Sequence, residues 1–375
     1  MYVSKLFVQN FRNLKEQTIE FSPKLNVLVG NNGMGKTNLL ESIYFLSIGR
    51  SPRAVKDSEC ILFNETKSNL KLEFVRNSVV RSIELFLDKQ KNKVLILDGM
   101  PAKKLSEIVG HFGSVYFSPQ ELQIVSGSPS VRRRFIDIIN CQISPQYMEE
   151  LSRYQHSIKQ RNNLLKKHKF GEYGLELESW DLQIAKLFAT ITKKRKMFVD
   201  ILNKTASKIH KKITNNQEEL NIKYVSSGTE EDFEKLCAQY LDNVKQNFEK
   251  DKVLEYSTFG CHNDDFEVKL NYLKDEKIVK TINLKKNGSQ GQQRTAVLAL
   301  ILAEVEILKS EYGENPVLLL DDVLGELDVQ RQRSLMDFCK EFQTIITCTN
   351  WDFLIPAKIF DVCEGKITEK QQKNT

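Results

Sequence analysis

The sequence has no pattern of paired cysteines. Its seven cysteines are scattered along the 375 residues, and no two of them form a C-x-x-C pair. An odd and unpatterned set argues against a disulfide framework and against a zinc cluster. We therefore expect reduced thiols in a cytosolic protein.

Long apolar runs are also missing. No apolar stretch approaches the roughly 20 residues that a bilayer-spanning helix needs. The first residues, Met1 to Lys5, lack a basic segment followed by an apolar one, so we expect no secretory signal peptide. Internal repeats and low-complexity segments are absent as well. We expect a cytoplasmic protein with no membrane partner, whose 41% apolar residues suffice for a core.

Charge of one sign is not in strong excess, because the formal net charge is only +6 at pH 7. The distribution is uneven, however. Between residues 151 and 215 there are 15 Lys and Arg but only five Asp and Glu. A basic middle segment suggests one face that meets an anionic polymer. A solvated helical surface would explain the same charges equally well.

The most informative segment, Gly30 to Thr37, matches the phosphate-loop pattern G-x-x-x-x-G-K-[ST] without a mismatch. The apolar run 24–29 predicts a buried strand before it, and the apolar spacing in 38–47 predicts a helix after it. The glycines let backbone N–H groups turn toward phosphate oxygens, and the start of the helix adds its positive end. The predicted nucleotide-binding residues are Gly30, Asn31, Asn32, Gly33, Met34, Gly35, Lys36, Thr37 and Asn38.

A second motif completes a nucleotide site. Residues 317–322 form an apolar run that ends in two carboxylates, which is typical of the strand that holds Mg²⁺ in phosphate-loop ATPases. Lys36 offers a mobile point charge to the outer phosphates, and we expect Thr37 and Asp321 to bind the metal. Asp322 lies where a carboxylate could orient or deprotonate the attacking water. ATP and Mg²⁺ are therefore the predicted cofactors.

The two motifs lie far apart in the sequence, so the C-terminal part must return beside the N-terminal part. Apolar alternation predicts strands at 5–11, 18–21, 69–75, 79–87 and 93–97, with turns at Arg76-Asn77 and Asp98-Gly99. Helical spacing over 132–212 predicts two long antiparallel helices, broken near Gly171 and Gly174. Further strands are predicted at 221–225, 266–270, 280–284, 316–320 and 344–347, helices at 291–310 and 330–341, and a hairpin at 360–368.

A third segment, Gly288 to Arg294, precedes the predicted helix at 291–310. A serine and a glycine at a helix N-terminus can form an anion seat, although serine there is usually only an N-cap. Beside the two phosphate motifs, this segment resembles the signature loop of ATP-binding-cassette enzymes, and Gly325 to Asp328 resembles their D-loop. The matching signature positions are Ser289, Gln290, Gly291 and Gln292. In that class the signature loop closes on the γ-phosphate of a second subunit, which implies an ATP-sandwiched homodimer.

With these elements placed, the chain resembles the RecF family of bacterial recombination-repair ATPases nearly end to end. The resemblance is carried by Asn10-Phe11-Arg12-Asn13, Gly30 to Asn38, Gly49-Arg50-Ser51-Pro52-Arg53, Phe117-Ser118-Pro119, Gly127-Ser128-Pro129, Arg132 to Asp137, Ser289 to Gln292 and Leu320-Asp321-Asp322. Cys261 and Asn263 depart from the family pattern, which usually has Pro and Arg there. Gln120 replaces a common acidic residue.

The resemblance implies an α/β fold: an ATP-binding-cassette-type ATPase head of parallel and antiparallel sheets, with an α-helical second lobe. We expect lobe I with the phosphate loop at 1–129, a helical arm at 130–215, and the rest of the head, with the signature loop, at 216–375. It further implies ATP-dependent binding to gapped DNA and single-strand/duplex junctions, cooperation with RecO and RecR in loading recombinase, and association with the nucleoid.

The helical arm at 130–215, which includes the basic segment 151–215, supplies the DNA-contact candidates. These are Arg132, Arg133, Arg134, Lys193, Lys194, Arg195 and Lys196. Because lysine dominates and aromatic residues are few, we expect contacts to the DNA backbone with little base readout. Arg132 to Arg134 could equally lie near the nucleotide or cap a helix.

Asp322 stands where cassette transporters usually carry Glu. Its shorter side chain holds the carboxylate farther from the water, so we predict slow hydrolysis, suited to a switch. Alternatives are an ATP-dependent DNA nuclease of the overcoming-lysogenization-defect type, with His262, Asp264 and Asp265 as metal ligands, a transporter ATPase subunit, and an architectural DNA-bridging ATPase. Too few residues follow Asp328 for the metal-binding domain of such nucleases, and the long helical insert argues against a transporter subunit.

Overall fold

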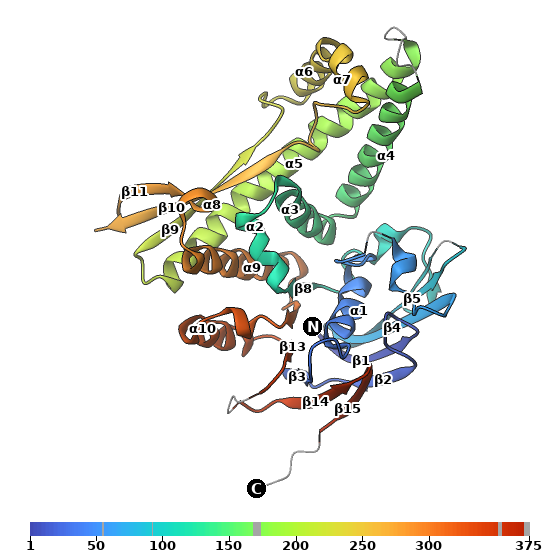
Figure 1. The fold of residues 1–375 in the computed structure, drawn as a ribbon, viewed down its shortest axis with the longest axis vertical. Helices are drawn as coiled ribbons and strands as arrows, with labels where there is room; N and C mark the ends of the chain where they lie inside the picture. The colour runs from blue at the N-terminus through green and yellow to red at the C-terminus, as the bar shows by residue number, and fades with distance from the viewer. Residues whose placement is uncertain (55, 92, 168–173, 352–354, 371–375) are drawn as a thin grey trace. The chain divides into compact units, whose positions relative to one another are not determined.

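The computed structural model describes residues 1–54, 56–91, 93–167, 174–351 and 355–370, and the chain divides into two units (Figure 1). The first unit contains Met1–Gln123 and Val297–Thr375, and the second contains Ile124–Ala296. One boundary falls at the start of α2 (Gln123–Ser126) and the other within α9 (Gln290–Tyr312). The segment 216–375, expected from the sequence to belong to the ATPase head, is thus divided between the two units.

The first unit contains an antiparallel sheet with the strand order β2-β1-β4-β5-β6-β7. Its strands are β1 (Tyr2–Gln9), β2 (Gln17–Glu20), β4 (Lys67–Arg76), β5 (Val79–Asp88), β6 (Val94–Leu97) and β7 (Met100–Pro101). Alternate apolar residues of β4 are buried, as the sequence alternation predicts. The predicted turns are confirmed, because Asn77 and Asp98 adopt positive φ values of 49° at the ends of β4 and β6.

The second sheet of this unit carries the phosphate motifs, in the order β15-β14-β3-β13-β12-β8. Its strands are β3 (Leu25–Val29), β8 (Ser114–Phe117), β12 (Val317–Asp321), β13 (Thr344–Cys348), β14 (Lys358–Cys363) and β15 (Lys366–Glu369). Only β15 runs antiparallel to its neighbour. Every residue of β12 and β13 is buried, as expected for continuous apolar runs in a covered parallel sheet. Strands β3 and β12 both run parallel to β13, which lies between them. The phosphate loop after β3 and the carboxylates at the end of β12 therefore lie at the same end of the strands.

Helix α1 (Lys36–Ile48) follows β3 and contacts strands of both sheets. Eleven of its 13 residues are buried, which explains why apolar residues occur all around it. The shorter elements of the unit are η1 (Asp57–Cys60), η2 (Leu105–Ile108), η3 (Pro119–Leu122), η4 (Leu324–Glu326) and α10 (Val329–Cys339). The four-residue strand β8 was not predicted, because so short a run shows no usable periodicity.

The second unit contains six helices wholly within its described residues, and one three-stranded antiparallel sheet. The helices are α3 (Pro129–Ile143), α4 (Pro145–Lys167), α5 (Leu175–Ile213), α6 (Phe233–Gln246), α7 (Phe248–Leu254) and α8 (Leu284–Asn287). The strands are β9 (Glu218–Val225), β10 (Asp265–Lys274) and β11 (Lys277–Asn283), in the order β11-β10-β9. The 39-residue α5 packs against α4, α6 and β9.

The predicted pair of long helices corresponds to α4 and α5, but the helical region is more divided than expected. Helix α3 is separate from α4, because Pro145 begins α4 and the peptide N–H of Ser144 closes α3 on the Asn140 carbonyl. Gly174 precedes the first residue of α5, whereas Gly171 lies outside the described residues. Leu284, predicted to end a strand, begins α8.

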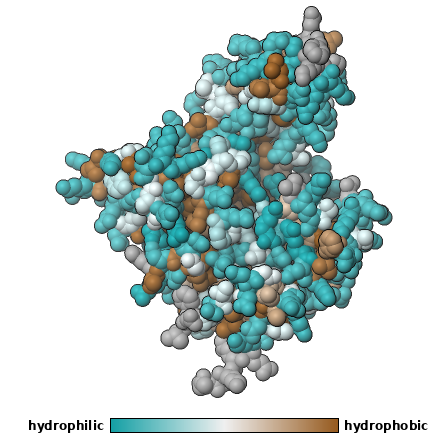
Figure 2. Space-filling model, viewed as in Figure 1, coloured by the Kyte–Doolittle hydropathy of each residue, from teal (hydrophilic) through white to brown (hydrophobic). Residues whose placement is uncertain are grey.

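Polar residues cover most of the face shown in Figure 2, and apolar side chains appear on it as separate patches. No helix within the described ranges is long and apolar enough to cross a membrane. All seven cysteines are described, and none of them is in a disulfide bond.

Candidate nucleotide-binding site

The phosphate loop connects β3 to α1 and is held open by glycine. Gly35 has a φ of 110°, a conformation that side chains disfavour, and begins the turn into α1. A Cβ atom at Gly30 would clash with the carbonyl oxygen of Val362 in β14. The ammonium of Lys36 lies inside the loop, where Nζ donates to the carbonyl oxygens of Gly30 at 2.5 Å and Asn31 at 2.9 Å. The anion-binding role of this loop remains a prediction from the sequence, and the loop conformation is compatible with it.

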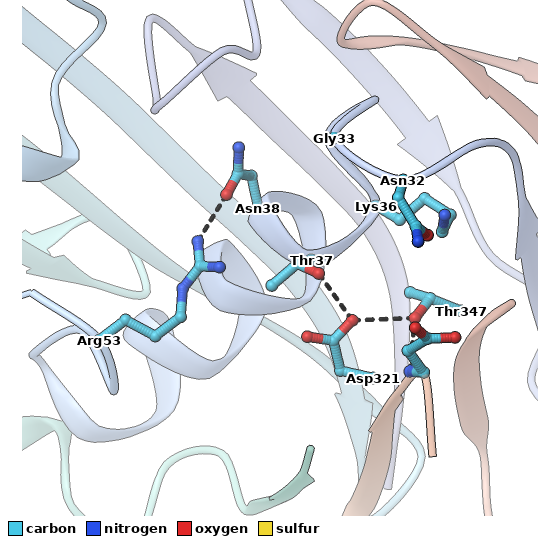
Figure 3. A pocket seen from close by; sticks show the side chains of 10 residues that line it. Asn32, Gly33, Lys36, Thr37, Asn38, Arg53, Asp321 and Thr347 are labelled. Atoms are coloured by element: carbon cyan, nitrogen blue, oxygen red, sulfur yellow. Dashed lines mark hydrogen bonds between the residues drawn. The ribbon is translucent and has the colours of Figure 1, made fainter. Parts of the chain in front are cut away.

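Three hydroxyl groups converge on Asp321 at the end of β12, and Figure 3 shows two of them, those of Thr37 and Thr347. Oγ1 of Thr37 and Oγ1 of Thr347 donate to Oδ1 at 2.8 and 2.9 Å, and the hydroxyl of Tyr116 donates to Oδ2 at 2.8 Å. Burial and the neighbouring Asp321 charge raise the pKa of Tyr116, so its hydroxyl remains a donor throughout the neutral range. The arrangement fixes the carboxylate 2.8 Å from the Thr37 hydroxyl, which joins two hard oxygen donors suited to Mg²⁺.

A cavity of about 320 Å³ lies against these groups. It is lined by Asn32, Gly33, Gly35, Lys36, Thr37, Asn38, Arg53, Asp321, Asp322 and Thr347. The lining combines loop N–H groups and two cations with two carboxylates, which is the chemistry required by a polyphosphate bound with a divalent metal. Two of these residues, Arg53 and Thr347, were not assigned to the nucleotide site from the sequence.

Asp322 follows Asp321 but differs from it in conformation and environment. Its φ is 54°, in the left-handed region that Asp tolerates better than most residues, and its side chain is exposed. Its peptide N–H donates to Oγ1 of Thr347 at 2.9 Å, whereas its carboxylate has no hydrogen-bond partner among the described residues. The carboxylate is thus free to accept a hydrogen bond from a water molecule at the cavity wall.

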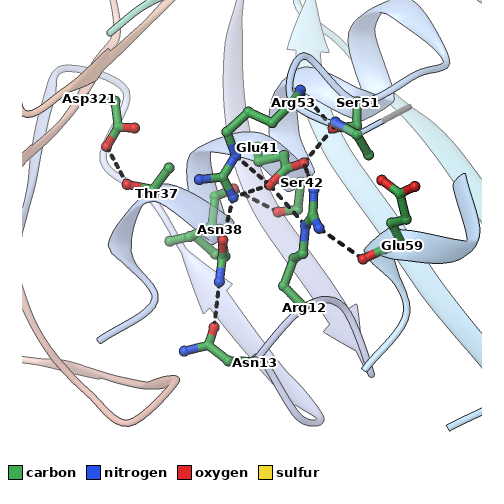
Figure 4. Close-up of polar contacts among 12 residues, drawn as sticks. Arg12, Asn13, Thr37, Asn38, Glu41, Ser42, Ser51, Arg53, Glu59 and Asp321 are labelled. Atoms are coloured by element: carbon green, nitrogen blue, oxygen red, sulfur yellow. Dashed lines mark hydrogen bonds and ion pairs between the residues drawn. The ribbon is translucent and has the colours of Figure 1, made fainter. Parts of the chain in front are cut away.

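Arg53 is joined to α1, the helix that follows the phosphate loop, through Glu41 and Asn38 (Figure 4). Arg53 pairs with Oε2 of Glu41, and Nη2 also donates to Oδ1 of Asn38 at 2.6 Å. Arg12 binds the same carboxylate through Nε and Nη2, at 3.2 and 2.7 Å. Arg12 and Arg53 lie in segments that carry the family resemblance, but no spacing in the sequence predicts that both bind Glu41, because the three residues come from separate segments.

The signature-like residues belong to the second unit and form the N-terminus of α9. The peptide N–H of Gln292 donates to Oγ of Ser289 at 3.2 Å, and the peptide N–H of Ser289 donates to Oε1 of Gln292 at 3.1 Å. This reciprocal pair is a capping box, which leaves Ser289 exposed at the helix start. Nε2 of Gln292 also donates to Glu218 and to the Tyr272 hydroxyl, at 2.7 and 2.8 Å, and so ties the loop to β9 and β10.

Asp328, the predicted D-loop residue, precedes α10 in the first unit. Its Oδ1 accepts from the peptide N–H of Arg331 at 3.0 Å, so it is the N-cap of that helix, and it also pairs with the Arg331 side chain. This local role neither requires nor contradicts a contact with a second subunit. The D-loop assignment remains a prediction.

The DNA-contact candidates do not form one basic face, because two of them are buried in structural ion pairs. Arg132 pairs with Asp265 at 2.6 Å, and Arg195 pairs with Asp137 at 2.8 Å while also donating to the Cys261 carbonyl oxygen at 2.5 Å. Their side chains are only 6% and 3% exposed. Phosphate contact is therefore the wrong expectation for these two arginines.

The other members of the set are more accessible. Arg133 donates to the carbonyl oxygen of Asp264 at 2.7 Å, Lys194 pairs with Glu150 at 2.6 Å, and Lys196 pairs with Glu231 at 2.8 Å. Arg134 and Lys193 are exposed. These five residues remain predicted DNA contacts.

The alternative metal cluster at His262, Asp264 and Asp265 has its polar atoms engaged within the protein. His262 contacts the Tyr154 hydroxyl at 2.8 Å and the Ser257 carbonyl oxygen at 2.9 Å. Asp264 accepts from the Tyr224 hydroxyl and the Ser227 peptide N–H, and Asp265 is occupied by Arg132. Within the described ranges no three acidic, histidine or cysteine side chains form a metal-binding group.

A phosphate loop and a hydroxyl-bound carboxylate, on a mixed sheet beside an antiparallel one, define the head of an ATP-binding-cassette-type ATPase. Residues 2–373 match the RecF/RecN/SMC N terminal domain family. The head domain of Smc bound to the C-winged helix domain of ScpA, at 17% identity and a TM-score of 0.54 over all of this chain and 98% of that one, shares the fold. The predicted fold class is confirmed.

More similar proteins specify the family. "DNA replication and repair protein RecF" of Clostridium tetani is 40% identical over 98% of this chain and all of its own length. The protein of the same name from Lachnoclostridium phytofermentans is 38% identical, over 98% of this chain and 99% of its own. A solved structure of the recombination mediator protein RecF with ATP in the RecFOR pathway is 34% identical, with a TM-score of 0.88 over 99% of this chain and 98% of that one. The chain belongs to the RecF family.

Proposed function

We propose that this chain is an ATP-dependent DNA-binding protein of recombinational repair and replication restart. ATP closes two copies into a dimer on gapped DNA, where it promotes recombinase loading with RecO and RecR, and hydrolysis releases the DNA. One observation carries the proposal: Thr37 and Asp321, from opposite ends of the sequence, lie 2.8 Å apart at a phosphate cavity in a chain of the RecF family. The names of its relatives, a replication and repair protein and a recombination mediator bound to ATP, support it.

Different residues of the cavity bind the phosphates, the metal ion and the attacking water. The loop N–H groups and the start of α1 face the phosphates, and Lys36 adds a cation inside the loop. Thr37 and Asp321 would hold Mg²⁺, which supplies charge neutralisation at the outer phosphate oxygens when bound. Asp322 accepts a hydrogen bond from the attacking water and orients it. Because its carboxylate stands on a short side chain, we expect slow turnover.

Dimerisation depends on the second unit in this proposal. The exposed Ser289, held at the N-terminus of α9 by its capping box with Gln292, is presented to the γ-phosphate bound by another copy. The phosphate loop of one copy and the N-terminus of α9 of the other copy then form one composite nucleotide site. Bound ATP thereby contacts both copies of the chain and holds the dimer together, and its hydrolysis lets the two copies separate.

The test measures molecular mass by light scattering, with and without ATP and Mg²⁺, together with binding to gapped duplex DNA. We expect an ATP-dependent dimer that binds DNA more tightly than the monomer does. Lys36→Met should bind no ATP and stay monomeric, whereas Ser289→Arg should bind ATP as a monomer. Ser289→Ala is the matched control, because it removes the hydroxyl without adding bulk and should still dimerise.

Two results would contradict the proposal. If Ser289→Arg dimerises with ATP as the wild type does, the signature loop does not complete a shared site. If wild-type DNA affinity is the same with and without ATP, the nucleotide is not the switch. Hydrolysis is measured separately with Asp322→Asn, which should retain ATP-induced dimerisation while losing turnover.

A further inference from the structure

Glu41 is a buried carboxylate shared by two arginines next to the phosphate loop. Its side chain is 0% exposed, and it lies in the second turn of α1, four residues after Thr37. Oε1 accepts from Arg12 at 2.7 Å and from the Ser51 hydroxyl at 2.5 Å, while Oε2 accepts from Nε of Arg12 at 3.2 Å and from Arg53. Burial alone would raise the pKa of Glu41, but the hydrogen bonds from Arg12 and Ser51 and the Arg53 charge lower it overall.

The two arginines differ in what their bonds leave available. Arg12 uses all three nitrogens, because Nε and Nη2 bind Glu41 and Nη1 donates to the Glu59 carbonyl oxygen at 2.8 Å. Arg53 binds Glu41 and Asn38 through Nε and Nη2, and its Nη1 has no hydrogen-bond partner among the described residues. Arg53 also lines the phosphate cavity, and Arg12 does not.

Asn38 joins this cluster to the phosphate loop itself. It follows Thr37 directly, accepts from Nη2 of Arg53 at 2.6 Å, and donates to Oδ1 of Asn13 at 2.8 Å. The guanidinium of Arg53 is therefore fixed by two acceptors on the same face of α1, one turn apart (Figure 4). A cation held in this way loses little conformational freedom when an anion arrives, so more of its charge interaction remains as binding affinity.

We propose that Glu41 is a positioning residue for nucleotide binding, which holds Arg53 at the cavity wall so that Nη1 meets a phosphate oxygen of the bound nucleotide. This inference rests on the proposed function, because it assumes that the cavity takes a nucleoside triphosphate. Glu41 itself does not touch the ligand. Glu41 affects nucleotide affinity only by holding Arg53 in place, while its bond to Arg12 stabilises the fold.

A double-mutant cycle separates positioning from a general loss of structure. The affinity for a fluorescent ATP analogue with Mg²⁺ is measured for the wild type, Glu41→Gln, Arg53→Met, the double variant and Arg12→Met. We expect Arg53→Met to weaken binding roughly tenfold or more, as for a lost hydrogen bond to a charged group. Glu41→Gln should weaken binding several-fold in the wild-type background and not at all in the Arg53→Met background.

Arg12→Met is the matched control, since it removes a cation from the same carboxylate without removing one from the cavity. It should lower the free energy of unfolding but leave the affinity of the folded protein within about twofold. Equal weakening by Arg12→Met and Arg53→Met would overturn the inference, as would additive effects of Glu41→Gln and Arg53→Met. If Glu41→Gln does not fold, Glu41→Asp, which keeps the charge but shortens the side chain, takes its place in the cycle with the same expected dependence on Arg53.

The failure of this inference is distinguishable from failure of the proposed function. Lys36→Met is measured beside the other variants as the reference for loss of binding at the phosphate loop. A wild type that binds no ATP analogue contradicts the proposed function. A wild type that binds it, together with an Arg53→Met variant of equal affinity, contradicts only the positioning role of Glu41.

Discussion

The two units of the chain each bury a carboxylate–arginine cluster, and the clusters differ in what they leave exposed. In the first unit, the side chains of Arg12 and Arg53 on Glu41 are 21% and 28% exposed, and Arg53 lines a cavity. In the second unit, Arg161 donates to Asp181 at 2.6 Å and to Asp251 at 2.7 Å. All three of those side chains are 0% exposed. Arg53, which is partly exposed and lines the cavity, can contact a ligand, whereas the fully buried Arg161 can only stabilise the fold.

The same distinction explains which basic residues were misjudged. The basic sequence around Arg132 and Arg195 predicts that both residues contact DNA. Their carboxylate partners, Asp265 and Asp137, lie 133 and 58 residues away in the chain. Charge that appears uncompensated along the sequence is thus compensated in space. The arginines of this chain must be judged by their partners rather than by local charge.

The largest effect on stability is expected from disrupting the fully buried cluster of Arg161, Asp181 and Asp251. Arg161→Met removes the guanidinium that pairs with the buried carboxylates of Asp181 and Asp251, which we expect to lower the free energy of unfolding by about 3–5 kcal/mol. Chemical denaturation followed by circular dichroism measures the change, with the exposed Lys159→Ala as a control that should change little. The ATP affinity of the folded variant should stay the same. A loss of ATP affinity with no loss of stability would contradict the purely structural role of Arg161.

Asp321→Asn tests the cluster of the first unit that faces the nucleotide cavity. Asn can still accept hydrogen bonds from Thr37 and Thr347, so we expect only a modest loss of stability. The lost charge should weaken ATP binding in the presence of Mg²⁺ by roughly tenfold or more. In EDTA the variant and the wild type should bind ATP almost equally. Titration of a fluorescent ATP analogue under both conditions measures this, and an equal loss in EDTA would rule out a metal role for Asp321.

Sequence alone predicts the parts of the site that are local. The phosphate loop, the strand β3 before it and the helix α1 after it are contiguous, so their pattern identifies them, and β12 is recognised by its apolar run and final carboxylates. Thr347 and Arg53 join the cavity only through strand order and side-chain pairing. No spacing rule in one sequence predicts those contacts, just as none predicts the Arg132–Asp265 pair.

A smaller effect is expected from acid titration of Glu41. Its pKa is lowered in the folded protein, because the hydrogen bonds from Arg12 and Ser51 and the charge of Arg53 outweigh the effect of burial. Its charge therefore stabilises the fold fully above the unfolded-state pKa, about 4.3. This contribution is lost as the pH falls from there through the folded-state pKa. The difference in unfolding free energy between wild type and Glu41→Gln should narrow over that acid range, and a constant difference would mean that Glu41 is not charged in the fold.

The smallest effect is expected at Tyr116, which binds Asp321 from the side opposite the two threonines. Tyr116→Phe removes the donor to Oδ2 and leaves the donors to Oδ1 in place, so we expect a loss of about 1 kcal/mol in the free energy of unfolding. Tyr256→Phe, at a tyrosine that is 49% exposed, should cost less. Because Oδ2 stays aligned by the bonds to Oδ1, ATP affinity with Mg²⁺ should change less than it does in Asp321→Asn. A loss as large as that of Asp321→Asn would show that the orientation of this carboxylate, and not only its charge, separates the cluster that faces the nucleotide cavity from the fully buried one.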